Sequence, residues 1–277
     1  MGRVFATVIA LAALWGAATG LLLPRAAHRL SVEPGEPWRS SCPAGHPFTG
    51  FARGWAGTGR CARCARCEEG RGGGAPLRTA VGSTAYGEPH SATRTRNHTR
   101  TLPYVLLCAL ACAALAAATG PRPELGVWLL LAPFVLLLAA VDLRVRRLPD
   151  VLTLPLAAAG AVLLGLAQLL PGDGGSWLGA LLGGAGLGAA HLLLHLINPD
   201  GMAFGDVKLA LVTGTALGWY GFPVLFTGTF AGFLLGSLYG LGLIVTGRGS
   251  RKSQFPFGPF MIAGAWAGVL LGALGAR

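Results

Sequence analysis

Charge is scarce in this sequence, and negative charge is scarcest. Only 12% of the 277 residues are charged, with 11 acidic against 22 basic side chains, whereas 53% are hydrophobic. Lysine is nearly absent, since only Lys208 and Lys252 accompany the arginines. A composition so poor in charge excludes an ordinary soluble domain and predicts an all-α polytopic membrane protein.

The net charge of +11 does not point to a nucleic-acid-binding protein, because the positive charge is clumped. Twelve arginines lie between Arg25 and Arg100, in a polar segment rich in Gly and Pro. A basic segment beside apolar runs favours the anionic headgroups of membrane lipids as its partner. We therefore expect lipid contacts and no nucleic acid.

Apolar runs long enough to span a bilayer recur along the chain. Residues 4–23 predict a first transmembrane helix, because its basic residues follow the run, whereas those of a cleaved signal peptide precede it. Breaks rich in Pro, Gly and charge separate seven further runs. These lie at residues 102–119, 125–141, 151–170, 177–197, 207–221, 223–246 and 257–275. The sequence thus predicts about eight transmembrane helices.

The chain divides into three predicted parts, which are a first transmembrane helix at 1–23, a basic loop at 24–101 and a membrane domain of about seven helices at 102–277. We place this loop in the cytoplasm and let successive spans cross the membrane in alternating directions. Of the 22 basic residues, all but three then lie on the cytoplasmic side, and the exceptions are Arg3, Arg122 and Arg277. This arrangement obeys the positive-inside rule.

Two acids stand at the ends of apolar runs. Asp142 closes the run 129–142, and Asp206 opens the run that begins at 207. The charge-derived orientation puts both at the cytoplasmic face. An ionisable group at the edge of hydrocarbon is a functional hypothesis by default. Solvation at the membrane edge, or pairing of Asp142 with Arg144, is the structural alternative.

Two neighbouring carboxyl groups have a specific chemistry. They cannot both ionise cheaply, so one keeps its proton and acts as a general acid while the other activates a water. Gly205 would let the backbone approach a substrate closely. Lys208 either tunes the local field or anchors the chain at the basic membrane face. The pattern predicts an aspartyl catalytic pair.

Four cysteines crowd into the polar segment, namely Cys42, Cys61, Cys64 and Cys67. Their tight spacing is typical of a structural zinc site and less so of disulfides. With Cys42, Cys61 and Cys64 as three ligands, the fourth is either Cys67 or His46. Reduced thiols without a metal are the alternative interpretation.

Three separated motifs carry a family resemblance. The first runs from Ala140 to Asp150 and has an Asp, a short basic stretch and then Leu-Pro-Asp. The second is Gly201–Leu209, and the third is Pro256-Phe257-Gly258-Pro259 before the last run. In this order they resemble the bacterial type IV prepilin peptidases, membrane aspartyl proteases of the Gly-x-Gly-Asp kind. Ala203 stands where the first Gly of that motif is usual.

The resemblance implies a function and its residues. Asp142 and Asp206 would be the catalytic pair, supported by the motif residues Gly205, Lys208, Pro256, Gly258 and Pro259. The enzyme would cleave the leaders of prepilins or of secretion pseudopilins at the cytoplasmic face of the bacterial inner membrane. It would then methylate the new N-terminus from S-adenosylmethionine.

Three rival functions stay open on the sequence alone. A transporter or channel would use Asp142 and Asp206 as ion or proton sites. A zinc-dependent regulatory membrane protein would carry inactive acids. A peptidase that no longer methylates would keep the same fold and aspartates.

Overall fold

A computed structural model describes residues 2–33, 35–42, 45–49, 51–58, 61, 64, 101–199, 201–248 and 256–276. Within these ranges the chain is helical, and its only extended pairing is an isolated bridge between Ser41 and Pro47. The predicted all-α class is confirmed.

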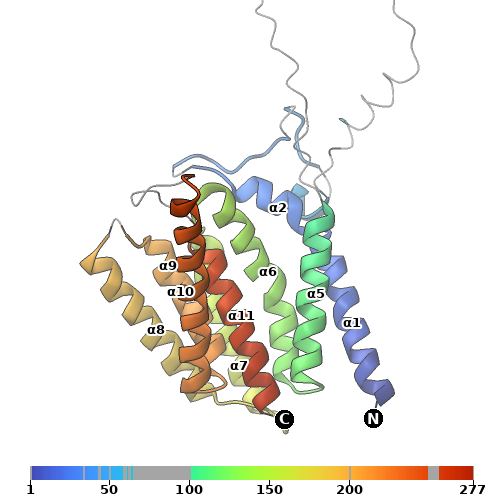
Figure 1. The fold of residues 1–277 in the computed structure, drawn as a ribbon. Coiled ribbons are helices and arrows are strands. Elements are labelled where there is room, and N and C mark those ends of the chain that lie inside the picture. Colours follow the sequence, from blue (N-terminus) through green and yellow to red (C-terminus); the bar gives the residue numbers. More distant parts are fainter. Residues whose placement is uncertain are drawn as a thin grey trace, which may run out of the picture.

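Long helices lie side by side in one bundle, as Figure 1 shows. Both termini lie at the same end of this bundle. The helices are α1 (Gly2–Gly20), α2 (Leu23–Leu30), α3 (Phe51–Gly54), α5 (Thr101–Thr119), α6 (Glu124–Val145), α7 (Asp150–Gln168), α8 (Trp177–Ile197), α9 (Phe204–Gly218), α10 (Phe222–Val245) and α11 (Gly258–Gly275).

Seven of these helices are long and apolar enough to cross a membrane, so the protein is a multi-pass membrane protein. They are α1, α5, α6, α7, α8, α10 and α11. The eighth predicted span corresponds to α9, whose 15 residues rise only about 22 Å against a hydrocarbon core of about 30 Å. It packs against α7, α8, α10 and α11, so neighbouring helices enclose it.

Small residues bring α8 and α9 together. A Cβ on Gly183 would lie 2.5 Å from the carbonyl oxygen of Gly214, and one on Gly179 would lie 2.6 Å from that of Gly218. Close backbone approach at small residues is a usual way to pack membrane helices. Gly186 differs, because a Cβ there meets no described atom within 4 Å.

The sequence did not predict α2. This eight-residue helix follows α1 and lies across one end of the bundle (Figure 1). Its residues Leu23 and Ala27 are buried in one cluster with Leu137 and Val141 of α6. The short helix therefore packs on the last turns of α6, the helix that carries Asp142.

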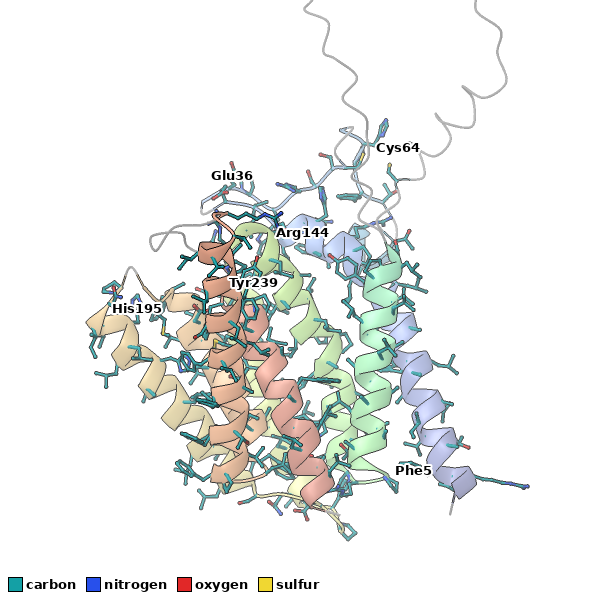
Figure 2. All side chains as sticks on the ribbon, in the orientation of Figure 1. Phe5, Glu36, Cys64, Arg144, His195 and Tyr239 are labelled. Carbon is teal, nitrogen blue, oxygen red and sulfur yellow. The ribbon has the colours of Figure 1, made fainter. Side chains whose placement is uncertain are left out.

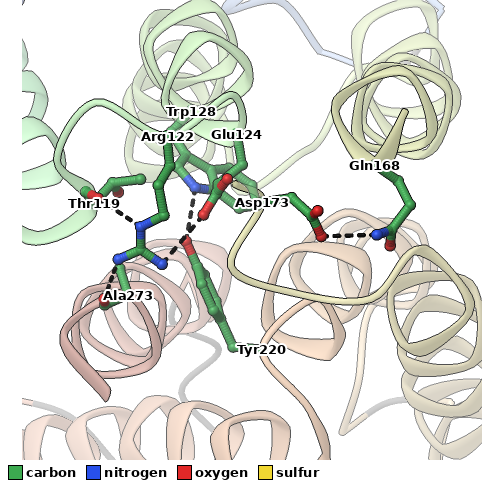
Figure 3. Close-up of polar contacts among 8 residues, drawn as sticks. All are labelled: Thr119, Arg122, Glu124, Trp128, Gln168, Asp173, Tyr220 and Ala273. Carbon is green, nitrogen blue, oxygen red and sulfur yellow. Dashed lines mark hydrogen bonds and ion pairs between the residues drawn. The ribbon is translucent and has the colours of Figure 1, made fainter. Parts of the chain in front are cut away.

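The two ends of the bundle differ in what they hold. The near end, as we call it, carries α2, the last turn of α6 and the first turns of α9 and α11 (Figure 1). The far end carries both termini and the turn between α9 and α10. A polar cluster fills the far end, where Arg122 contacts the fully buried Glu124 and Trp128 donates to the hydroxyl of Tyr220 (Figure 3).

Candidate active site

Asp142 lies in the last turn of α6 and is 96% buried, since its exposed fraction is 4%. The backbone N–H of Gly258 donates to its Oδ2 over 3.1 Å. A Cβ on Gly258 would lie only 2.8 Å from that oxygen. Glycine at the start of α11 is therefore what lets the backbone reach the Asp142 carboxyl group.

The chain turns sharply after Asp142. Arg146 adopts a left-handed conformation with φ of +50°, and its N–H donates to the Asp142 carbonyl over 2.8 Å. This turn ends α6 and leads into α7. Leu148 in the turn is buried, and a Cβ on Gly205 would lie 3.3 Å from its Cβ. The segment after the first aspartate thus packs against the segment before the second.

Asp206 lies in the first turn of α9 and is also buried, with an exposed fraction of 6%. A carboxyl group at this position interacts favourably with the helix dipole. Ala203, the residue that departs from the expected motif, is the N-cap of α9 with φ of −70°. Since this φ suits any residue, the backbone here does not require glycine.

The two aspartates meet at the near end, although 64 positions separate them in the sequence. The negative charge of Asp142 acts electrostatically on the Asp206 carboxyl group. Burying a charge without a partner is costly. Two neighbouring buried carboxyl groups are therefore an unusual arrangement that indicates a candidate functional site. Arg144, a suggested partner for Asp142, donates instead to the hydroxyl of Tyr104 over 2.8 Å.

Lys208 pairs with Asp150. Its Nζ lies 2.6 Å from Oδ1 of Asp150 and 4.7 Å from the ring centre of Phe204. The ion pair joins the first turn of α7 to the first turn of α9, beside Asp206. This link was not predicted from the sequence.

Two histidines, His191 and His195, lie four residues apart on α8. Nδ1 of His195 lies 2.8 Å from the carbonyl oxygen of Met202, and the imidazole therefore donates to the loop before α9. Nδ1 of His191 lies 3.0 Å from the carbonyl oxygen of Leu187, one turn earlier in α8. Figure 2 shows His195 at the near end, where it fastens the loop that leads to Asp206.

A second constellation lies beyond the near end, where Figure 2 shows Cys64. The ligand atoms of Cys42, His46, Cys61 and Cys64 all lie within 4.8 Å of one another. The two sulfur atoms of Cys42 and Cys64 are 3.7 Å apart, and Nδ1 of His46 is 3.3 Å from Cys64 Sγ. Tetrahedral zinc, with Zn–S near 2.3 Å, requires S···S of roughly 3.8 Å and S···N of roughly 3.5 Å.

The backbone explains why His46 joins this group. The N–H of Cys42 donates to the His46 carbonyl, and Gly45 forms the turn between them with φ of +80°. Burial, together with the Cys42 and Cys61 thiols, raises the pKa of the Cys64 thiol to about 12. A bound cation would be needed to hold these sulfurs as thiolates. This set of donors could bind a metal ion, whereas Cys67, the other predicted fourth ligand, lies outside the described residues.

The cysteine-containing segment is anchored on α2. The Arg25 guanidinium donates to the carbonyl of Thr49 over 3.1 Å, and the Arg29 guanidinium lies 4.1 Å from the ring centre of Trp55. Burial, together with the charge of Arg39, lowers the pKa of His28. Because α2 packs on α6, the metal-binding group is connected to the helix end that carries Asp142.

Known proteins match the part of the chain that holds both aspartates. Residues 129–244 match the model of the type IV leader peptidase family. These residues are similar to that family. The match agrees with the resemblance drawn from the first two motifs, which contain Asp142 and Asp206, whereas the third motif lies outside the matched residues.

Several curated relatives carry one name, prepilin leader peptidase/N-methyltransferase. The chain is 32% identical over 168 residues to that of Aeromonas salmonicida, covering 60% of this chain and 56% of the relative. It is 32% identical to that of Aeromonas hydrophila, covering 60% and 57%, and 33% identical to that of Burkholderia pseudomallei, covering 60% and 54%. The chain thus spans little more than half the length of the relatives it matches. No solved structure matches it.

Proposed function

We propose that this protein is a membrane aspartyl endopeptidase that removes the leader peptides of prepilins or pseudopilins, with Asp142 and Asp206 as its catalytic residues. The observation that carries the proposal is the burial of two interacting carboxyl groups at one end of a type IV leader peptidase domain. The names of the relatives supply the substrate class.

The geometry supports a division of labour between the aspartates. One carboxyl group would keep a proton and donate it to the leaving amine, while the other would take a proton from the attacking water. The Gly258 N–H fixes the orientation of the Asp142 carboxyl group. Gly205 lets Leu148 pack closely beside Asp206, since a Cβ on Gly205 would lie 3.3 Å from the Leu148 Cβ. No nucleophilic side chain is needed in this scheme.

A zinc ion would serve as a structural support. Cys42, Cys61 and Cys64 would bind it together with His46, and Cys67 is the alternative fourth ligand. Zinc would cross-link a segment with little apolar core of its own, within the proposed cytoplasmic loop 24–101. Substitution of Cys61→Ser should lower the bound zinc from about one ion per chain to nearly none, as elemental analysis of the purified protein would measure.

Orientation and domain limits follow from charge. We propose a first helix at 1–23 and a membrane peptidase domain at 102–277, in the bacterial inner membrane, with the near end at the cytoplasmic face. Arg25, Arg29, Arg144 and Arg248 all belong to the near end, in agreement with the positive-inside rule.

Methylation is a second proposed activity. The relatives are named N-methyltransferases as well as peptidases, and S-adenosylmethionine is the methyl donor that the resemblance implies. A transporter or channel is disfavoured, because residues 129–244 match a peptidase family.

Leader cleavage tests the function. The full chain, purified in detergent, would be mixed with a prepilin, and the product would be weighed by mass spectrometry. The expected result is loss of the leader mass, with a further methyl mass when S-adenosylmethionine is added. An intact prepilin from every substrate tried would contradict the peptidase, whereas cleavage without methyl transfer would remove only the second activity.

A further inference from the structure

The second aspartate stands at the end of a short loop. Residues 198–203 join α8 to α9, and Asp206 is the third residue of α9. Within the loop, the N–H of Gly201 donates to the Asn198 carbonyl over 3.1 Å. At its end, the N–H of Asp206 donates to the Ala203 carbonyl over 3.0 Å. Both bonds join residues three positions apart, so they shape the loop locally without fixing it to the rest of the bundle.

His195 ties this loop to α8. Nδ1 of His195, in the last turn of α8, lies 2.8 Å from the carbonyl oxygen of Met202, seven positions later. Since a carbonyl oxygen only accepts, Nδ1 carries the proton of this bond. His191 makes no such link, because its Nδ1 faces the carbonyl of Leu187 within α8. The backbones of α8 and α9 pack closely, so the His195 bond fixes the loop relative to α9 as well.

A layer of side chains continues from His195 past the second aspartate. The ring centre of His195 lies 5.5 Å from that of Phe204, and Nζ of Lys208 lies 4.7 Å from the Phe204 ring centre. Lys208 pairs in turn with Asp150 of α7. The first turn of α9, which holds Asp206, is therefore connected to α8 on one side of the layer and to α7 on the other. Phe204 is 50% exposed, so the ring contact buries little area, and the hydrogen bond is the stronger constraint.

We propose that His195 is a positioning residue for the second carboxyl group, and that its hydrogen bond to the Met202 carbonyl sets where Asp206 stands relative to Asp142. This proposal rests on the proposed function. A displacement of the Met202 carbonyl passes to Asp206 through only four positions of the chain. A misplacement of about 1 Å in a catalytic group can cost about 100-fold in rate. His195 lies outside the motif Gly201–Leu209, so the family resemblance gives it no role.

Two substitutions separate the donor from the ring. His195→Phe keeps a ring and removes the N–H, whereas His195→Asn removes the ring and keeps an N–H at the δ position. We expect His195→Phe to lower kcat for leader removal roughly tenfold and to change KM by less than about twofold, because a displaced Asp206 affects the chemical step. His195→Asn should keep kcat within about threefold of the wild type.

The neighbouring leucine provides the matched control. Leu196 is exposed on the same turn of α8, so Leu196→Phe should leave kcat unchanged. His195 is only half-buried, so all three variants should melt within about 3 °C of the wild type. If His195→Phe had the kcat of the wild type, or if His195→Asn were as slow as His195→Phe, the hydrogen bond would not position Asp206 and the proposal would be wrong.

Hydrogen–deuterium exchange of the full chain in detergent measures the loop without any substrate. The amides of Gly201 and Asp206 should exchange at least about fivefold faster in His195→Phe than in the wild type, and at the wild-type rate in His195→Asn. Wild-type exchange in His195→Phe would overturn the proposal. Failure of the wild type to cleave any prepilin would contradict the proposed function itself, and the exchange rates would still decide whether His195 holds the loop.

Discussion

Both ends of the helix bundle bury carboxyl groups, but at one end the neighbour is a guanidinium group and at the other it is a second carboxyl group. At the far end, Glu124 is wholly buried and its Oε1 lies 3.4 Å from the Arg122 guanidinium (Figure 3). Arg122 is held in turn by the carbonyl oxygens of Thr119 and Ala273. At the near end, Asp206 lies within electrostatic reach of Asp142, and Asp142 accepts a hydrogen bond from the neutral N–H of Gly258.

This difference separates a structural acid from a reactive pair. A buried carboxylate beside a guanidinium is compensated, and its loss would leave an unpaired charge. Two buried carboxyl groups that interact with each other destabilise the doubly ionised state, which is the property acid–base chemistry requires. A buried carboxyl group is thus expected to serve stability at one end and catalysis at the other.

The largest effect is expected at the near end. Asp142→Asn should reduce the rate of leader removal by at least about 1000-fold, because the amide cannot exchange the required proton. The double variant Asp142→Asn/Asp206→Asn should be no slower, since the two residues act as one unit. Single-turnover rates on one prepilin measure both. A double variant slower than the single by a further large factor would show that the two aspartates act separately.

Next in size is the far-end acid. Glu124→Gln should lower the free energy of unfolding by about 2–3 kcal/mol, because it leaves the Arg122 charge poorly compensated in a buried site. Thermal unfolding in detergent measures the loss. Asp173→Asn is the control at the same end, because this partly exposed acid accepts a hydrogen bond from the Gln168 amide, and its replacement should cost under about 1 kcal/mol. Equal free energies of unfolding for the two variants would contradict a structural role for Glu124.

A smaller effect is expected from the glycine that holds Asp142. Gly258→Ala should reduce kcat by roughly 10- to 100-fold, because its Cβ would displace the carboxyl group by clashing with Oδ2. Gly242→Ala in α10 is the matched control, since a Cβ there meets no described atom within 4 Å. Unchanged kcat for Gly258→Ala would mean that the N–H contact does not orient Asp142.

The smallest effect is expected from the ion pair beside Asp206. Lys208→Ala should destabilise the protein by less than about 1 kcal/mol, because the Asp150 side chain is 60% exposed. A double-mutant cycle with Asp150→Ala should give a coupling energy of about 0.5 kcal/mol. A coupling energy near zero would leave Lys208 as a basic anchor of the membrane face.

The sequence predicted the long helices well because each apolar run ends at a break rich in Pro, Gly and charged residues. The predicted span at 177–197 has the limits of α8, where Ser176 caps the helix, and the other predicted spans that begin beyond residue 101 lie within four residues of the observed helices. In contrast, α2 escaped prediction because it is only eight residues long and its apolar face lies among arginines. Its packing on α6 is a tertiary contact that periodicity in so short a segment does not reveal.

The candidate site was predictable in part. Charge placed Asp142 and Asp206 at one membrane face, and the motifs supplied Gly258. The reason for Gly258, its contact with a carboxyl group 116 positions earlier, required the fold. The Lys208–Asp150 pair was equally hidden, because nothing local relates the starts of α7 and α9. His46 had been kept as an alternative ligand, and only the turn at Gly45 shows how it reaches the cysteines.

The central claim is that the near-end acids are catalytic and the far-end acid is not. The most direct test measures leader removal from one prepilin by Asp206→Asn and by Glu124→Gln, each at a temperature well below its own unfolding midpoint. The account predicts that Asp206→Asn gives no detectable product while Glu124→Gln cleaves at a rate within about threefold of the wild type. Cleavage by Asp206→Asn at the wild-type rate would contradict it.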